Sequence, residues 1–245
     1  MKQQILKVTE NVRIAENIFK MALESPELEE QKPGQFVNIK LDGLYLRRPI
    51  SVCESDPGVL TIVYKAVGKG TEQMSRIRAG ERLDVLTGLG NGYDLSKSGD
   101  RPLLLGGGVG VPPLILLARK LREQGKEVTA VLGFNTKKEV FGEHDLWLSG
   151  CKVIVATADG SYGTKGFVTD AMPEDYSYFY TCGPEPMLKA VCKKTKTSGQ
   201  FSFEERMGCG FGACMGCSCK TITGYKRICR EGPVLEKEEI AGWND

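Results

Sequence analysis

The first part of the chain alternates short apolar runs with turn sequences. Within residues 1–99, runs rich in Val, Ile, Leu and Tyr are separated by Lys32-Pro33-Gly34, Asp56-Pro57-Gly58 and Ala79-Gly80. Proline and glycine at such positions interrupt regular structure, and several short strands at this spacing are typical of a small antiparallel barrel. The acidic run at residues 27–30 is expected to be a solvated loop.

After Asp100 the pattern changes to buried apolar runs separated by helical segments. Leu114, Leu117 and Leu121 recur at the spacing of an amphipathic helix. Four apolar runs are expected to be strands: residues 103–105, 128–132, 152–157 and 178–182. Alternating strands and helices predict a parallel sheet wound by right-handed crossovers.

A third segment, from Gln200 onward, holds five closely spaced cysteines and then residues 222–228, which resemble a short hairpin around Gly224. The pattern therefore predicts a β-barrel followed by α/β structure, in three units. These are an antiparallel barrel at 1–99, a parallel-sheet domain at 100–199 and a small domain at 200–245.

Composition places the chain among ordinary globular proteins. Its 245 residues are 41% hydrophobic and 26% charged, with a net charge of +2, which gives no reason to expect nucleic acid or a membrane as partner. The apolar stretch 103–118 is interrupted by four glycines and two prolines, so no bilayer span is expected. Five of the nine cysteines fall within 209–229 and no export signal is visible, which favours metal-bound thiolates in a reducing cytoplasm.

The C-terminal cysteines carry the most specific chemistry. Cys209, Cys214, Cys217 and Cys229 have the x4, x2, x11 spacing with which plant-type ferredoxins hold a [2Fe-2S] cluster. Small residues between them let the backbone curl around a cofactor and aim N–H groups at the sulfurs. The fifth thiol, Cys219, is expected to point away from the metal. A structural zinc site is the alternative, although zinc sites usually pair two CxxC-like knuckles.

A glycine-rich loop follows the first strand of the second unit and opens a helix. Gly106, Gly108 and Gly110 would let a pyrophosphate approach the backbone at the helix N-terminus. Pro112 suits the first helical position, where its missing N–H leaves nothing unpaired. The spacing differs from G-x-G-x-x-G, so a structural turn is the competing interpretation.

Two barrel segments suggest a second phosphate site. Residues 47–51 combine arginines able to grip phosphate with a hydroxyl, and residues 64–71 offer the aromatic face of Tyr64, cations and flexible backbone amides. Separately, these segments are typical of strand ends with solvated basic residues. Together with a nucleotide loop and a cluster motif, they favour a flavin between one- and two-electron partners.

Over essentially its whole length the chain resembles the ferredoxin–NADP reductase-like superfamily. More narrowly, it resembles the electron-transfer subunits of NAD-dependent (class 1B) dihydroorotate dehydrogenase. The signatures that carry the resemblance are 47–51, 68–71, 88–92, 106–113, 181–184 and the four-cysteine run. The resemblance implies FAD in the barrel, NAD in the parallel-sheet domain and the [2Fe-2S] cluster in the C-terminal domain.

The resemblance also implies particular contacts. Those with FAD would come from Arg48, Pro49, Ile50, Ser51, Val63, Tyr64, Lys65, Gly70 and Thr71. Arg48 and Lys65 would neutralise the pyrophosphate, and Ser51 would hydrogen-bond near the flavin N5. Ile50 stands where the superfamily has an aromatic residue, so it can pack against the flavin but cannot stack. The expected contacts with NAD are Gly106, Gly108, Gly110, Asp159 and Cys182.

The implied activity is electron transfer in pyrimidine biosynthesis. Electrons would leave dihydroorotate in a separate FMN-containing catalytic subunit, two copies of each subunit forming a heterotetramer, and pass through the cluster and FAD to NAD+. No catalytic base for dihydroorotate is visible, and the only histidine, His144, is expected to be a surface or packing residue. The alternatives are a ferredoxin- or hydrogenase-linked NAD(P)H oxidoreductase subunit and a non-enzymatic redox sensor.

The loop at residues 157–163 bears on the choice of coenzyme. Asp159 offers a carboxylate that can accept a hydrogen bond from a ribose 2′-hydroxyl but would repel a 2′-phosphate. Asp-Gly is also a common turn dipeptide, so Asp159 could be a turn residue only. The nearest cation in sequence is Lys165, and we therefore expect a preference for NAD(H) over NADP(H).

Overall fold

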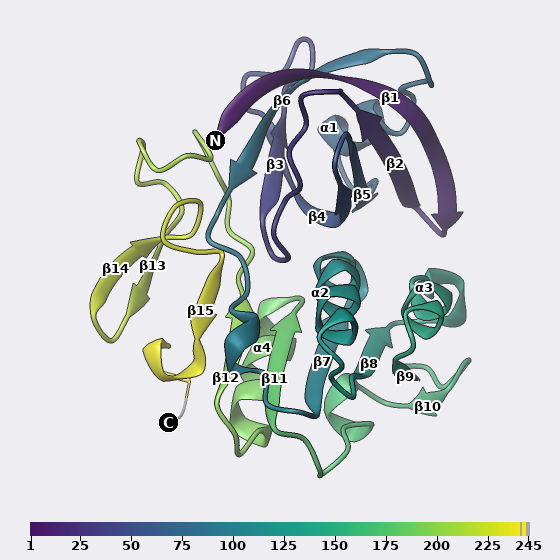
Figure 1. The fold of residues 1–245 in the computed structure, drawn as a ribbon, viewed down its shortest axis with the longest axis vertical. Helices are drawn as coiled ribbons and strands as arrows, with labels where there is room; N and C mark the ends of the chain where they lie inside the picture. The colour runs from purple at the N-terminus through teal and green to yellow at the C-terminus, as the bar shows by residue number, and fades with distance from the viewer. Residues whose placement is uncertain (241, 244–245) are drawn as a thin grey trace.

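The computed structural model describes residues 1–240 and 242–243, and its N-terminal part is the predicted antiparallel barrel (Figure 1). Six strands close it in the order β1-β2-β5-β4-β3-β6. The strands are β1 (Lys2–Ala15), β2 (Ile18–Glu24), β3 (Phe36–Ile39), β4 (Arg48–Asp56), β5 (Val59–Lys65) and β6 (Arg82–Leu89). A short helix, α1 (Lys69–Met74), joins β5 to β6. The acidic run 27–30 is a loop as expected, except that Leu28 is buried.

The alternation of side chains along β3 gives the barrel two different faces. Val37 and Ile39 belong to the barrel core, while Phe36 packs with residues of the C-terminal segment. Successive residues of a strand point to opposite sides of the sheet, so Phe36 and Asn38 share the outer side. This outer side of β3 is where the cysteine-rich segment meets the barrel.

The second sheet has seven strands in the order β10-β9-β8-β7-β11-β12-β15, all parallel except β15. They are β7 (Pro102–Gly107), β8 (Thr129–Phe134), β9 (Lys152–Thr157), β10 (Thr164–Lys165), β11 (Tyr178–Cys182), β12 (Gly199–Ser202) and β15 (Val234–Glu236). The four predicted strands are β7, β8, β9 and β11. The prediction did not include the two- to four-residue strands β10, β12 and β15.

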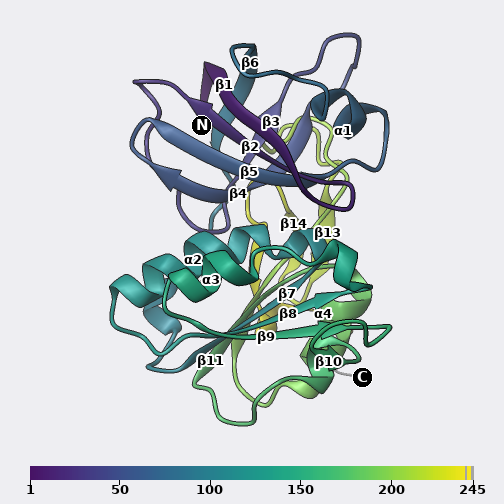
Figure 2. The same cartoon turned by 90° about the vertical axis from the view of Figure 1, so that its right-hand side faces the viewer.

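Helices cover both faces of this sheet, and Figure 2 shows α2 and α3 between it and the barrel. The helices are α2 (Pro112–Glu123), α3 (Glu143–Leu148) and α4 (Glu185–Lys194). One apolar core joins Leu114 and Leu117 of α2 to Leu104 and Leu132 of the sheet. A second core lies on the other face under α4. Five 3-10 turns complete the set: η1 (Leu95–Lys97), η2 (Gly108–Gly110), η3 (Lys137–Glu139), η4 (Val168–Asp170) and η5 (Lys237–Glu239).

Helix α2 also holds the barrel to the parallel-sheet domain. Its Leu116 belongs to the barrel core, and Arg119 donates to the Ser55 carbonyl at 2.7 Å and to the Asp56 carboxylate at 3.1 Å. Buried apolar contacts and a partly buried charged hydrogen bond both stabilise such an interface.

The C-terminal segment forms its own hairpin and then returns to the large sheet. The hairpin consists of β13 (Ser218–Thr221) and β14 (Gly224–Arg227), so the predicted hairpin at 222–228 starts later than the observed one. Gly224 lies at the start of β14 rather than in the middle of the turn. Strand β15 falls within the predicted 200–245 unit but pairs antiparallel with β12, whose edge it covers. The division into 1–99, 100–199 and 200–245 remains a prediction.

Within the described residues, no helix has both the length and the apolarity needed to cross a membrane.

Candidate cofactor and electron-transfer sites

The cysteine loop has the backbone shape needed to wrap around a cofactor. Gly210 and Gly212 have φ of +78° and +91°, and Met215 has φ of +60°, all in the left-handed region that favours glycine. The Ala213 N–H donates to Cys209 Sγ at 3.2 Å, and the Cys209 N–H donates to Cys214 Sγ at 3.4 Å. N–H groups directed at sulfur are the usual second shell of an iron–sulfur cluster.

The other two candidate ligands lie deeper, against the barrel. Cys217 and Cys229 are each 2% exposed, and the Cys229 N–H donates to Cys217 Sγ at 3.4 Å. They pack with Phe36 of β3 and Leu86 of β6. The four thiols therefore form two pairs, Cys209 with Cys214 and Cys217 with Cys229.

This pairing fits a [2Fe-2S] cluster, in which four thiolates serve two irons. In residues 1–240 and 242–243 no three or more His, Cys, Asp or Glu side chains are gathered closely enough to hold a metal ion, so the four-cysteine ligand set remains a prediction. Burial raises the pKa of the Cys209 thiol, but N–H donors from Phe211, Cys214 and Ala213 outweigh it and lower the pKa to about 6. Burial and the neighbouring Cys217 raise the pKa of Cys229 to about 12.

Cys219 is placed differently from these four. It lies on β13, and burial raises the pKa of its thiol. It lines a cavity of about 170 Å3 together with Phe203 and Leu235, and it also packs against the apolar cluster that contains Cys217 and Cys229. Among the described residues, Cys219 makes no hydrogen bond to the sulfurs of Cys209, Cys214, Cys217 or Cys229. Its predicted lack of a ligand role remains a prediction.

The two arginines at the start of β4 differ in what they bind. Arg47 makes two 3.0 Å bonds to the Asp84 carboxylate and a 2.9 Å bond to the Asp84 carbonyl. Arg48 bonds only the main-chain carbonyls of Leu46 and Arg47 in the described part of the chain. A guanidinium without a carboxylate partner is free to bind phosphate. Arg48, rather than Arg47, is thus the available cation.

A glycine lies directly against this guanidinium. A Cβ added at Gly70 would lie 2.1 Å from Arg48 Nε, so a side chain there would displace the Arg48 guanidinium. Thr71 Oγ1 accepts hydrogen bonds from the N–H groups of Val67 and Gly68 at 3.0 and 3.3 Å. The Gly68–Thr71 turn is therefore folded tightly beside Arg48, a cradle that suits the pyrophosphate of FAD.

The remaining β4 residues alternate between two sides. Pro49 lies opposite Asn38 and Ser51 opposite Phe36, and residues opposite each other on antiparallel strands share a face. Ile50 lies opposite Val37 and packs against the barrel core. Pro49 and Ser51 therefore lie on the outer side of the barrel, and the partly buried Ile50 side chain points toward the barrel core.

On β5 the structure corrects one expectation. Tyr64 is 2% exposed, its hydroxyl donates to Asn11 Oδ1 at 2.8 Å, and its ring stacks on Phe19. Burial raises the pKa of Tyr64 to about 12. The prediction that Tyr64 offers an aromatic face to a ligand is wrong, because its ring is enclosed in the barrel core. Any contact of Val63 and Tyr64 with FAD would have to use the main chain.

Lys65 is engaged across the domain interface. Its Nζ lies 2.9 Å from Glu139 Oε1, and the hydrogen bond from Lys65 lowers the pKa of Glu139. Asn135 donates to the other Glu139 oxygen at 2.9 Å. A pyrophosphate role for Lys65 would therefore require it to exchange this partner.

These residues border a cavity of about 520 Å3 at the carboxyl edge of the parallel sheet. The cavity lies where the strand order changes direction, between β7 and β11, the usual nucleotide crevice of such sheets. Its walls come from both domains. They include Ile18, Lys65, Gly107, Gly108, Val109, Gly133, Phe134, Asn135, Glu139, Phe141, Gly166, Phe167, Val168, Thr169, Pro184, Pro186, Met187, Ala190 and Glu204.

Each glycine of the predicted nucleotide loop is required for a different structural reason. Gly108, with φ of +50°, lines the cavity. A Cβ on Gly106 would lie 2.9 Å from Val111 Cγ2, and one on Gly110 would lie 2.2 Å from the Cys182 carbonyl oxygen. Gly106 and Gly110 thus permit close packing of loop, helix and strand, as glycines in dinucleotide folds do. Pro112 begins α2, as expected.

Cys182 and Glu204 lie near each other beside this cavity. Cys182, at the end of β11, is 2% exposed, and burial raises its pKa, with a smaller contribution from Glu204. Glu204 follows β12, lines the cavity, and has its pKa raised by partial desolvation. Sequence reasoning missed Glu204, although a carboxylate just after a strand of this sheet could have signalled it.

Asp159 lies in the turn after β9. Its carboxylate accepts hydrogen bonds from the Ser161 N–H at 2.9 Å and hydroxyl at 2.7 Å, which lower its pKa. Its own N–H donates to the carbonyl of Asn135, a residue of the cavity wall. Asp159 is thus a turn residue next to the cavity, and its role toward ribose remains a prediction. His144 lies exposed on α3 and stacks on Trp147.

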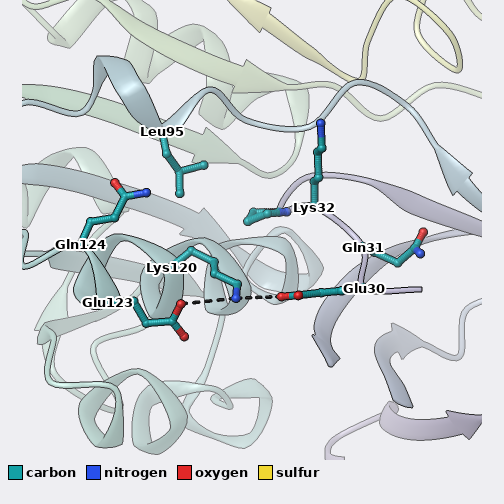
Figure 3. A pocket seen from close by; sticks show the side chains of 8 residues that line it. Glu30, Gln31, Lys32, Leu95, Lys120, Glu123 and Gln124 are labelled. Carbon is teal, nitrogen blue, oxygen red and sulfur yellow. Dashed lines mark ion pairs between the residues drawn. The ribbon is translucent and has the colours of Figure 1, made fainter. Parts of the chain in front are cut away.

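A further cavity of about 340 Å3 separates the barrel loop at 30–33 from the end of α2 (Figure 3). Lys120 spans it, pairing with Glu30 at 2.7 Å and with Glu123 at 3.3 Å. No predicted site residue lines this cavity, and its Lys120–Glu30 pair connects α2 to the barrel.

Comparison with known proteins agrees with this geometry. Residues 204–241 match the family described as the iron-sulfur cluster binding domain of dihydroorotate dehydrogenase B. The chain is 44% identical to the dihydroorotate dehydrogenase B (NAD(+)) electron transfer subunit of Geobacillus sp. (strain WCH70), over 98% of this chain and 99% of that one. The corresponding subunit of Fusobacterium nucleatum is 45% identical, with the same coverage.

The chain belongs to the family of dihydroorotate dehydrogenase B electron transfer subunits. Like its relatives, it is an oxidoreductase component with a ferredoxin–NADP reductase-like fold. A solved structure of NADH-dependent reduced ferredoxin-NADP oxidoreductase, studied for flavin-based electron bifurcation, is also similar. It is 33% identical, with a TM-score of 0.89 over 98% of this chain and 90% of that one.

Proposed function

We propose that this chain is the electron-transfer subunit that carries electrons from an FMN-containing, dihydroorotate-oxidising subunit to NAD+ in pyrimidine biosynthesis. In the net reaction dihydroorotate gives up two electrons and two protons, NAD+ takes up a hydride, and one proton is released. FAD can accept two electrons together and release them singly, which neither nicotinamide nor a [2Fe-2S] cluster can do. The observation that supports this proposal most is that one chain holds candidate sites for a cluster, FAD and a nicotinamide next to one another.

Each site has its own residues. Cys209, Cys214, Cys217 and Cys229 would hold the cluster, with N–H groups at their sulfurs. Arg48 and Gly70 would hold the FAD pyrophosphate, and Pro49 and Ser51 would face the flavin. The nicotinamide would enter the 520 Å3 cavity, which Lys65 reaches from the barrel and Gly108 from the nucleotide loop. In this proposal the flavin would lie between the cluster and the nicotinamide.

The catalytic partner would approach at the cysteine loop. Cys214 is exposed there, and Phe211 and Met215 are 44% and 54% exposed. The β3–β4 loop of the barrel also presents a fully exposed aromatic residue, Tyr45. Single-electron exchange requires donor and acceptor to be close, and aromatic residues and methionine are enriched in protein interfaces. Two copies of each subunit, working in the cytoplasm, would complete the assembly.

A reconstitution assay tests this function. The holoprotein is mixed with an FMN-containing dihydroorotate-oxidising subunit, and dihydroorotate-dependent formation of NADH is followed. We expect activity from the mixture and none from this chain alone, because it offers no acid or base for dihydroorotate among the predicted sites. Dihydroorotate oxidation by this chain alone, or no activity in the mixture, would refute the proposal.

The likeness to the ferredoxin-linked oxidoreductase supports one other candidate, a subunit that exchanges electrons between NAD(P)H and ferredoxin. The same holoprotein, given reduced ferredoxin and NAD+ in place of the dihydroorotate-oxidising subunit, distinguishes the two. Rapid NADH formation with ferredoxin and none with the dihydroorotate-oxidising subunit would favour this candidate.

A further inference from the structure

A single buried amide links the barrel to the first cluster ligand. Asn38, on the outer side of β3, is 1% exposed, and its Nδ2 donates to the carbonyl oxygen of Cys209 at 3.3 Å. On the neighbouring strand it lies opposite Pro49, which belongs to the predicted FAD segment. Asn38 therefore touches the cluster loop while standing beside the flavin site.

The chain at this contact is shaped to allow close approach. Gly210, the residue after the first ligand, has φ of +78°. A Cβ at this position would lie only 2.3 Å from Asn38 Nδ2. A side chain at residue 210 would therefore be strained at this positive φ and would displace the Asn38 amide or the cysteine loop.

The acceptor end of the same amide is unusual. Asn38 Oδ1 is buried and has no hydrogen-bond partner among the described residues. Buried polar atoms in folded proteins are nearly always satisfied, and an apolar residue of similar size would avoid the cost. A buried acceptor beside Pro49 suggests that its donor belongs to a bound group rather than to the chain.

A second asparagine joins the barrel to the same segment by a different route. Asn91, just after β6, donates to the carbonyls of Glu231 at 3.2 Å and Val234 at 2.7 Å, and accepts from the Val234 N–H at 3.1 Å. It is exposed, and its contacts follow the last ligand instead of touching the first. Asn91 thus shares the docking function of Asn38 but not its place between the two cofactor sites.

We propose that Asn38 is a positioning residue for electron exchange between flavin and cluster. Its amide N–H fixes the backbone of Cys209 against the β3–β4 face that carries Pro49 and Ser51. This holds the loop in the conformation in which the Ala213 N–H reaches Cys209 Sγ. The inference rests on the proposed function, since it needs both cofactors in place.

The test uses anaerobic holoprotein saturated with FAD and mixed rapidly with NADH. Flavin reduction is followed by absorbance, and cluster reduction by freeze-quench electron paramagnetic resonance. In Asn38→Leu we expect flavin reduction at the parent's rate but cluster reduction slowed about tenfold or more, the usual effect of losing an outer-shell partner. The cluster potential, measured by redox titration, should become more negative as the N–H···S bonds loosen.

Two further variants keep the test decisive. Asn38→Ser stays polar and is too short to reach the Cys209 carbonyl, so it should show the same defect if the leucine variant fails to fold. Asn91→Leu loses the other docking bonds and should leave both the rate and the potential close to the parent's. FAD and iron contents are measured for every variant.

An unchanged rate and potential in the Asn38 variants would overturn the inference. An equal loss in Asn91→Leu would overturn it too, because general docking would then explain the effect. If NADH reduces no cluster in the parent protein, the proposed function itself fails. If NADH reduces the cluster in the parent protein and the Asn38 variants keep the parent's rate and potential, only the role of Asn38 is refuted.

Discussion

At the scale of single residues, neighbouring side chains of one type have different roles because their partners differ. Arg47 is already paired with Asp84, whereas Arg48 bonds only carbonyl groups in the described chain and lies against Gly70. Residue type alone presents the two arginines as equivalent, and the family resemblance implies Arg48. The structure supplies a physical reason for that choice, because the Asp84 carboxylate already holds the Arg47 guanidinium.

Arg48→Ala should weaken FAD binding. Loss of a charged hydrogen bond to phosphate costs about 1.5–3 kcal/mol, which corresponds to roughly tenfold or more in Kd. Titration of the flavin-free protein with FAD measures this. The matched variant Arg47→Ala should lower stability through loss of the Asp84 pair but keep the affinity for FAD. Undiminished affinity in Arg48→Ala would remove the assigned role.

Asp159 should favour NADH over NADPH. In Asp159→Ala the preference should fall by about tenfold or more, because a charged hydrogen bond to the ribose is lost and the repulsion of a 2′-phosphate disappears. Turnover efficiency with both coenzymes measures it. The control Ser161→Ala removes the turn partner but keeps the carboxylate, and should retain the preference. Equal use of both coenzymes by the parent protein would contradict the assignment.

At the scale of elements, one ion pair connects the end of β5 to η3 across the domain interface. Lys65 and Glu139 are 32% and 18% exposed, and the pair stands at the wall of the nucleotide cavity. Its strength should depend on pH, because the hydrogen bond from Lys65 lowers the pKa of Glu139 from its usual 4.5.

Glu139→Gln should lower the free energy of unfolding by about 1 kcal/mol at neutral pH. A carboxyl group with a lowered pKa stabilises the fold above its unfolded pKa and ceases to do so as pH falls through its folded pKa. The difference between parent and variant should therefore shrink below pH 4.5. Denaturant unfolding across this range measures it. Glu24→Gln, which breaks the more exposed pair with Lys7, should have a smaller effect, and a pH-independent difference would contradict this account.

The cysteine loop gives a second prediction at this scale. Serine at Cys209, Cys214, Cys217 or Cys229 should abolish or alter the paramagnetic signal of the reduced cluster, because each supplies a thiolate. Cys219→Ser should leave the signal nearly intact, since Cys219 lies outside the x4, x2, x11 spacing and makes no hydrogen bond to the four sulfurs among the described residues. A cluster that survives replacement of any of the four, or is lost with Cys219, would show that the ligand set is misassigned.

The elements that sequence could predict were those with a strong local signal. The apolar runs of β7, β8, β9 and β11, the helical spacing of α2 and the turn residues of the barrel were sufficient for the fold class. Strand β15 could not be predicted, because three residues carry little periodicity. Its pairing with β12 also joins segments that are more than thirty residues apart in the sequence. Tyr64 was misjudged for a similar reason, since its burial depends on Phe19 and Asn11 from other strands.

The candidate sites show the same difference between local patterns, which the sequence reveals, and contacts between distant segments, which it does not. Cysteine spacing and the glycine loop are local patterns, so sequence could indicate them. Glu139 and Asn38 acquire their partners only when separate segments of the fold meet, so no local pattern reveals them. Contacts between distant segments are decided by the whole fold.

At the scale of the whole molecule, the C-terminal segment brings the three sites together. It packs its cysteines on the barrel through Phe36 and Leu86. It also adds β15 to the parallel sheet beside β12 (Figure 1). The barrel, bearing the flavin segment, is thereby in contact with both the cluster loop and the nucleotide cavity. This arrangement suits a flavin that exchanges pairs of electrons on one side and single electrons on the other.

The most direct test of this account is to analyse the anaerobically prepared chain and add NADH. We expect one FAD with two irons and two inorganic sulfides per chain, as a [2Fe-2S] cluster requires. NADH should bleach the flavin and then produce the paramagnetic signal of the reduced cluster. Zinc in place of iron, or a cluster that stays oxidised while the flavin is reduced, would contradict the account.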